Sequence, residues 1–160
     1  FIQPSGVSNP PAIGPGGTDL LILNNIIKNQ QGPTIWVSDS QLINNVIISS
    51  LFDPVIIAGT NNSIRYNIFN SNWPATWGNH SNVDPSTIFI DYANNNYHLR
   101  PDSPALASGE NGVDIGIYGG DAPYIDGGFP SLPSILQLKG DLVAAPGTGL
   151  NIEFKAKSNR

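Results

Sequence analysis

The residues that could carry out chemistry are few and scattered along this 160-residue sequence. It has no Cys and two His residues, and twelve Asp and Glu against seven Lys and Arg give a net charge of −5. The absence of Cys excludes a thiolate metal site and a Cys nucleophile. His80 and His98 stand alone, and neither Ser5 nor Ser108 lies in the Gly-x-Ser-x-Gly spacing of a nucleophile elbow. The sequence therefore predicts no catalytic residue and no metal-ligand cluster.

Aromatic side chains are better candidates for a binding site. Trp73 and Trp77 flank a short loop, and Tyr66 lies on the strand expected before it. Trp36 lies between two apolar residues of another expected strand, so its side chain should point outward. Exposed rings of this kind stack on sugar faces or anchor protein interfaces. The alternative is that both loop Trp residues close the end of the core.

An Asn followed by two apolar residues recurs at nearly constant spacing, and this repeat predicts the elements that position the aromatic residues. The copies are at Asn25, Asn45 and Asn67, which are 20 and then 22 residues apart. A period near 20 is typical of a β-solenoid, whose coils are too small to bury a core alone. We expect parallel strands stacked about 4.8 Å apart. We also expect the three Asn residues to turn the chain at one corner and to stack their amides into a ladder.

The composition favours an all-β fold. The chain contains 17 Gly and 14 Pro that separate short segments, and only 12 % of its residues are charged. No segment shows sustained helical periodicity, so we expect little helix. Seven dispersed Lys and Arg cannot form a phosphate-binding patch, which argues against a nucleic-acid partner. No apolar run approaches the roughly 20 residues of a transmembrane helix.

The chain divides into three parts by its local composition. Residues 1–18 are rich in Pro and Gly and predict an irregular lead-in. Residues 19–130 hold the repeats and a closing coil. Residues 131–160 contain two alternating apolar runs that predict a C-terminal β-hairpin, which we expect to cap the stack or pair with a partner. The lead-in offers no polar cap for the first coil, so we expect further coils upstream.

A series of short motifs follows the repeats. They are Val83-Asp84-Pro85, Phe89-Ile90-Asp91, Tyr97-His98-Leu99-Arg100-Pro101-Asp102-Ser103-Pro104-Ala105 and Asp114-Ile115-Gly116-Ile117-Tyr118. The series resembles the closing coil of right-handed parallel β-helix proteins of the pectate-lyase-like superfamily. The tail after it resembles the C-terminal tails of large secreted or surface proteins from Bacteroidota. The resemblance implies a right-handed parallel β-helix that is extracellular or at the cell surface, associated with the outer membrane.

Three Asp residues of this region have a structural interpretation. Asp84, Asp91 and Asp114 can accept hydrogen bonds from loop amides and so tie down the closing coil. The alternative is a structural Ca²⁺ site, because carboxylates and loop carbonyls are the ligands of that ion. No compact acidic loop is present, so we expect no metal and no cofactor.

The resemblance leaves two classes of function open. The superfamily includes polysaccharide lyases, which combine clustered acidic residues with an Arg or Lys base, and glycosidases, which need paired carboxylates. Here Asp19, Asp39 and Asp53 flank the expected strands one at a time, and Arg65 is the only Arg of the repeats. We therefore expect a non-catalytic scaffold or binding module within a larger surface protein or envelope assembly, with a polysaccharide or an envelope protein as its partner. The alternative is the C-terminal part of a lyase or glycoside hydrolase that acts on extracellular glycans.

Overall fold

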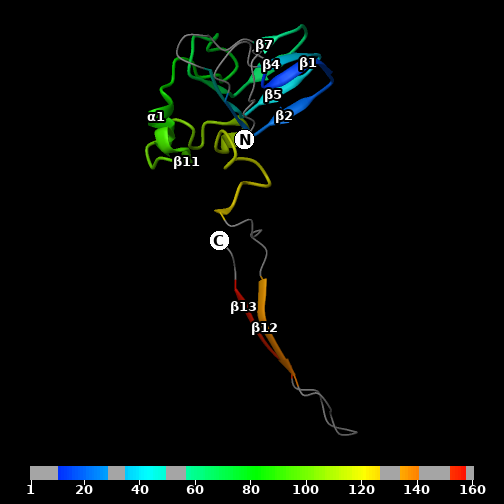
Figure 1. The fold of residues 1–160 in the computed structure, drawn as a ribbon, viewed down its shortest axis with the longest axis vertical. Helices are drawn as coiled ribbons and strands as arrows, with labels where there is room; N and C mark the ends of the chain where they lie inside the picture. The colour runs from blue at the N-terminus through cyan, green and yellow to red at the C-terminus, as the bar shows by residue number, and fades with distance from the viewer. Residues whose placement is uncertain (1–10, 29–34, 50–56, 127–133, 141–151, 158–160) are drawn as a thin grey trace. The chain divides into compact units, whose positions relative to one another are not determined.

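The chain is mostly β-strand and forms two compact units, Phe1–Pro123 and Tyr124–Arg160 (Figure 1). The computed structural model describes residues 11–28, 35–49, 57–126, 134–140 and 152–157. Helix in these residues is limited to a single turn, α1 (Pro85–Ile88), and two 3₁₀ turns, η1 (Tyr92–Asn94) and η2 (Glu110–Gly112). None of these helices is long and apolar enough to cross a membrane. The prediction of an all-β fold with little helix is confirmed.

Nine short strands of the first unit form three parallel sheets of three strands each. The first sheet contains β1 (Ile13–Thr18), β4 (Ile35–Ser38) and β7 (Ile57–Ala58); the second contains β2 (Leu21–Leu23), β5 (Gln41–Ile43) and β8 (Ser63–Arg65); and the third contains β3 (Ile26–Lys28), β6 (Val46–Ile48) and β9 (Ile68–Phe69). Consecutive strands belong to different sheets. Each repeat of the chain therefore adds one strand to every sheet.

The register of these sheets reproduces the sequence period. Leu21 lies opposite Gln41, and Gln41 lies opposite Ser63. These offsets of 20 and 22 residues are the spacings of the Asn repeat. The parallel stacking expected from the repeat is therefore present.

Apolar side chains of the three sheets fill the space between them. One cluster contains Ile22, Ile27, Ile35, Val37, Leu42, Ile47 and Phe69, all buried. A second cluster joins Ile26, Val46, Ile48 and Ile68 to Ile88, Phe89, Ala105 and Ile115 of the closing segment. Full burial of one such side chain stabilises the fold by about 1.5–3 kcal/mol. The closing segment is thus part of the core and not a peripheral loop.

The first repeat begins earlier than the sequence predicts. The last six residues of the expected lead-in form β1, which pairs with β4. The register shifts between Ile13 and Gly17, so Gly14, Pro15 and Gly16 bulge opposite one residue of β4. Pro and Gly therefore mark a bulged edge strand here. Residues 13–18 of the expected irregular lead-in are therefore a strand of the stack.

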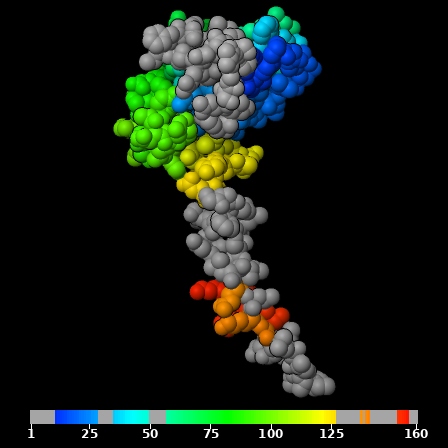
Figure 2. All heavy atoms as spheres, in the orientation of Figure 1, coloured from blue at the N-terminus to red at the C-terminus, as the bar shows by residue number. Residues whose placement is uncertain are grey.

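The segment after the repeats folds back on them. It first forms α1, β10 (Phe89–Asp91), η1 and β11 (Asn96–Leu99), with β10 and β11 antiparallel. Residues 110–120, which we call the strap, then pass from the second repeat to the first. The Glu110 backbone N–H donates to Asn44 Oδ1 at 2.8 Å, and a Cβ at Gly120 would lie 2.3 Å from Asn24 Nδ2. Figure 2 shows the green and yellow atoms of this segment against the blue atoms of the first strands.

The second unit contains the two strands predicted in the tail. They are β12 (Ser134–Gly140) and β13 (Ile152–Lys157), and they pair antiparallel as a two-stranded sheet. The unit begins at Tyr124, before the predicted boundary at residue 131.

Candidate functional site

A ladder of Asn side chains connects successive repeats. The backbone N–H of Asn25 donates to Asn45 Oδ1, that of Asn45 to Asn67 Oδ1, and that of Asn67 to Asn79 Oδ1, each at 2.9 Å. The side-chain Nδ2 atoms donate to the same oxygens at 3.0–3.2 Å. Asn79 is a fourth member that the repeat did not reveal, because it follows Asn67 by only 12 residues.

The left-handed backbone at this corner lies one residue before each ladder Asn. The φ angle is 53° at Asn24, 56° at Asn44 and 54° at Tyr66. The ladder residues themselves do not have positive φ, so the turn differs from the prediction by one position. The reason is the hydrogen bonding: the residue after the turn must direct its amide into the stack, where Asn45 Nδ2 donates to the carbonyl oxygens of Ile22 and Ile43 at 2.9 and 3.0 Å.

The three Asp residues singled out in the sequence accept hydrogen bonds from nearby loop groups. Asp84 caps α1 by accepting from the Ser86 backbone N–H at 2.8 Å, and Asp114 accepts from that of Ala107 at 2.8 Å. Asp91 accepts from the Asn94 side chain at 2.7 Å. In the described part of the chain, no three His, Asp or Glu residues are grouped so that they could hold a metal ion.

The four aromatic residues predicted to bind a ligand do not form one site. Trp36 lies on β4 and is 46 % exposed. Trp73 stacks on Phe69 with ring centroids 4.8 Å apart, so one face of its ring covers the core. Trp77 is 70 % exposed, and its carbonyl oxygen accepts from the backbone N–H of Tyr66, next to the last strand of the β2–β5–β8 sheet.

The outer face of the β2–β5–β8 sheet carries a network of hydrogen-bonded polar side chains, which includes Gln41, Ser63 and Arg65. Ile22, Leu42 and Ile64 belong to or pack against the first core cluster, so their neighbours in the strands point outward. Two columns of residues result, Leu21–Gln41–Ser63 and Leu23–Ile43–Arg65, and Ile43 in the middle of the second column is buried. We call this surface the outer face.

Trp77 continues the second column. The Tyr66 backbone N–H donates to the Trp77 carbonyl oxygen at 3.0 Å, as the Asn24 N–H donates to the Ile43 carbonyl at 3.2 Å. Ile43 is the strand partner of Leu23, so by the same register Trp77 lies opposite Arg65. The Tyr66 ring lies against the backbone after Trp77, where a Cβ on Gly78 would be 2.5 Å from the ring, so only glycine fits there. Tyr66 therefore supports the loop that presents Trp77.

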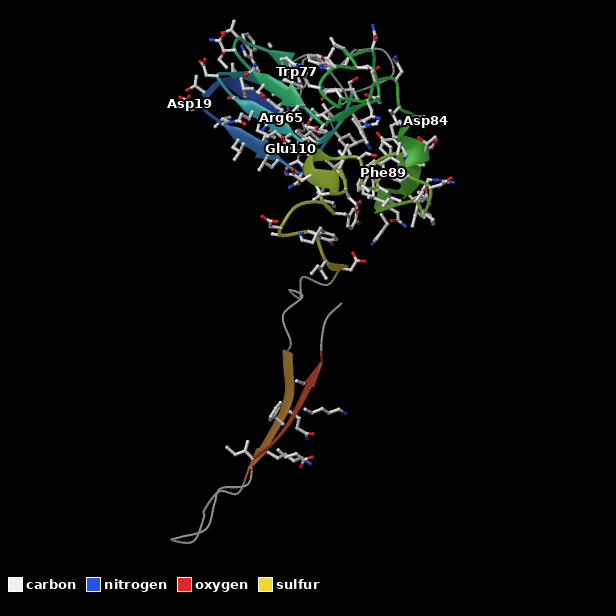
Figure 3. All side chains as sticks on the ribbon, turned by 180° about the vertical axis from the view of Figure 1, so that it is seen from behind. Asp19, Arg65, Trp77, Asp84, Phe89 and Glu110 are labelled. Atoms are coloured by element: carbon white, nitrogen blue, oxygen red, sulfur yellow. The ribbon has the colours of Figure 1, made fainter. Side chains whose placement is uncertain are left out.

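Arg65 is held on the outer face by three side chains. Its Nε donates to Glu110 Oε1 at 2.8 Å, and its Nη1 donates to Ser63 Oγ at 2.8 Å. Both Nη atoms face Gln41 Oε1, at 3.3 and 3.4 Å. Figure 3, which views the molecule from behind, shows Arg65 and Glu110 next to each other. The side chains of this ion pair are 28 % and 34 % exposed, so the network is ordered yet open to a ligand.

The sequence could not place Glu110 in this site. Glu110 lies 45 residues after Arg65 and belongs to no repeat. It reaches the outer face because its backbone N–H is bound to Asn44, which fixes the start of the strap. The site thus combines one residue of the strap with residues of the second and third repeats.

The chemistry available to this site is recognition by hydrogen bonds and an aromatic ring. Arg65, Gln41 and Ser63 provide donors and acceptors, and Trp77 provides an exposed apolar surface. No family model, no curated protein and no solved structure matches this chain.

Proposed function

We propose that the three parallel sheets are the sides of a right-handed parallel β-helix that serves as a non-catalytic scaffold or binding module. The register supports the helical path, since each repeat passes once through all three sheets before the next repeat begins. The Asn ladder supports it as well, because equivalent amides stack from repeat to repeat. Functions of such stacks usually lie on their outer surfaces.

The observation that carries the non-catalytic function is the pairing of Arg65 with Glu110. Glycosidases need two carboxylates about 5–10 Å apart, and lyases need a free base beside a charge-stabilising group. On the outer face, Glu110 is the carboxylate of the described network, and its charge is balanced by a guanidinium at 2.8 Å. This arrangement suits ligand recognition better than proton transfer.

The proposed setting is extracellular or at the cell surface, within a larger envelope assembly. A low content of charged residues, no Cys and many short strands between Gly and Pro support an exported β-rich protein. The proposed partner is a polysaccharide or an envelope protein, and the exposed ring of Trp77 supports either choice.

A carbohydrate-active enzyme is the second candidate. The observation that favours it is the presence of an Arg beside a carboxylate on a lateral face, which is the kind of pair that a lyase site contains. Catalysis would require Arg65 to release Glu110 when the substrate binds.

Binding and cleavage assays on the same purified chain distinguish these functions. We expect retention on a polysaccharide panel without new reducing ends and without the ultraviolet absorbance of unsaturated sugars. Cleavage that is lost in Glu110→Gln would show an enzyme. If no polysaccharide is retained and cross-linking on intact cells captures no envelope protein, the binding-module proposal is overturned.

A further inference from the structure

We propose that the outer face binds a neutral glycan, with Trp77 stacking on a sugar ring and Arg65 and Glu110 holding adjacent hydroxyl groups. This inference rests on the proposed binding function and identifies the site and the ligand class. The glycan would lie at the Trp77 end of the second column, beside Arg65 and Glu110, because Ile43 further along the column is buried.

The hydrogen-bonding capacity left on the ion pair matches adjacent hydroxyl groups. Arg65 Nη2 makes one long hydrogen bond, 3.4 Å to Gln41, and Glu110 Oε2 has no hydrogen bond within the described residues. A donor and an acceptor are therefore available on neighbouring side chains. Of two vicinal hydroxyls, one can accept from Arg65 while the other donates to Glu110, so both protein groups gain a partner.

The charge of the outer face favours a neutral ligand. Arg65 and Glu110 cancel each other, and the remaining members of the network, Gln41 and Ser63, are uncharged. An acidic sugar would have to place its carboxylate beside Glu110 on a chain of net charge −5. Two neighbouring carboxylates repel each other, so we expect the network to bind polyuronates more weakly than neutral glycans.

Apolar groups at both ends of the column suit the faces of sugar rings. Trp77 is 70 % exposed and adjoins Arg65, while Leu21 and Leu23 of the first repeat are 60 % and 38 % exposed. Ile43, which lies between Leu23 and Arg65 in the column, is 4 % exposed, so the apolar surface is interrupted there. The part of the face that a sugar ring can cover is therefore the ring of Trp77 beside the Arg65–Glu110 pair.

Among the described residues, Trp36 has no such polar surroundings, so it serves as a matched control. Its neighbour on β7 is Ala58, and the bulge with Gly14 and Gly16 lies opposite it on β1. These small residues leave the ring exposed but provide no side-chain hydrogen bonds. The same aromatic residue thus occurs once with a polar network and once without.

Calorimetric titration with neutral hexasaccharides from cellulose, xylan and mannan, and with hexagalacturonate, tests the inference. We expect at least one neutral ligand to bind and to be preferred over hexagalacturonate. Trp77→Asn removes the ring but keeps a residue that tolerates a φ of 54°, and it should weaken binding roughly tenfold. Trp36→Thr should change Kd by less than about twofold.

A variant of Glu110 tests the charge argument. The measured quantity is the ratio of the Kd values for a neutral and an acidic ligand, which a purely structural role of Glu110 would leave unchanged. Glu110→Gln keeps an acceptor beside Arg65 but leaves the guanidinium charge unbalanced. The ratio of the Kd for the neutral ligand to that for hexagalacturonate should then rise roughly tenfold in favour of the acidic sugar. An unchanged ratio would overturn the assignment of Glu110.

The remaining outcomes separate this inference from the proposed function. Binding that is lost in Trp36→Thr and kept in Trp77→Asn, or a wild-type preference for hexagalacturonate, overturns the site or the ligand class while the binding function stands. No binding to any of the three neutral ligands overturns the inference. If the chain also retains no polysaccharide of the panel and cell-surface cross-linking captures no envelope protein, both the inference and the proposed binding function are overturned.

Discussion

Removing the amide of Asn45 should destabilise the first unit far more than removing that of Asn25. The Asn45 side chain is fully buried, and its Oδ1 accepts from the Asn25 backbone N–H at 2.9 Å. Its Nδ2 donates to the carbonyl oxygens of Ile22 and Ile43. Asn45→Ala therefore leaves one part-buried N–H, that of Asn25, without an acceptor and two carbonyls without this donor.

The expected loss follows from these contacts. A stranded buried donor costs about 1–3 kcal/mol, and each lost hydrogen bond to a carbonyl about 1 kcal/mol. We expect the free energy of unfolding to fall by about 4 kcal/mol, a large part of the 5–15 kcal/mol typical of a domain. Asn25→Ala is the control, because it leaves the Asn25 N–H bound to Asn45 and removes mainly the bond to the Leu23 carbonyl at 2.7 Å. Its cost should be about 1 kcal/mol.

Urea unfolding followed by Trp fluorescence measures both variants. All three Trp residues of the chain lie in the unit Phe1–Pro123, so the signal reports that unit. Equal losses for Asn45→Ala and Asn25→Ala would refute the reasoning, since they would show that position in the ladder does not matter. A loss below about 1 kcal/mol for Asn45→Ala would show the same for the buried amide itself.

Three further predictions concern the backbone, the core and a buried phenol. Gly59→Ala should lower the free energy of unfolding by about 3 kcal/mol, because the φ of Gly59 is 104° and a Cβ there would lie 1.9 Å from a β4 carbonyl oxygen. Gly14→Ala is the control: a Cβ there would have no atom within 4 Å, so the loss measured by urea unfolding should be less than about 0.5 kcal/mol. Trp73→Ala should cost about 2 kcal/mol in the same assay, because its half-buried ring covers the core. Burial raises the pKa of the Tyr92 phenol above 10.0, although Lys28 opposes the shift. The free energy of unfolding should therefore be constant below about pH 9 and should fall as the pH rises past 10, because the unfolded chain loses this proton first. The fall should be less steep in Tyr92→Phe, which lacks the phenol.

Each of these has a result that would contradict it. Equal stability of the two Gly variants would mean that the backbone at Gly59 relaxes freely. An unchanged urea midpoint in Trp73→Ala would mean that Trp73 is not part of the core. The same alkaline slope in Tyr92→Phe and wild type would place the titrating group elsewhere.

The repeat predicted the parallel stacking and the amide ladder because both depend on a local pattern. An Asn between a turn and two apolar residues must meet its copy when the coils stack, and this holds for Asn25, Asn45 and Asn67. The pattern could not separate the residue that turns the chain from the residue that forms the ladder, because Asn occupies both positions in the first two repeats. Tyr66 in the third repeat is the one clue in the sequence, because the residue with a φ of 54° there is not Asn.

The polar network on the outer face depends on contacts between distant parts of the chain, which no periodicity contains. Trp77 joins the column of Arg65 although only 12 residues separate them, because the loop before Trp77 replaces two of the three strands of a repeat. Glu110 arrives through the strap, whose position depends on Asn44. The sequence therefore predicted exposed aromatic residues but not which of them would have polar neighbours.

The strap links the candidate site to the stability of the stack. Its N-terminal end places Glu110 on Arg65, and Ile115 further along belongs to the same core cluster as Ile26, Val46 and Ile68 of the three repeats. The Gly116 N–H donates to the Asn44 carbonyl at 2.8 Å, so the strap is fixed at the same left-handed corner that positions the ladder. A ligand that bridges Arg65 and Glu110 would therefore bind the third repeat and the strap at once. Because such a ligand binds only the folded arrangement, it should also stabilise the contacts between the repeats.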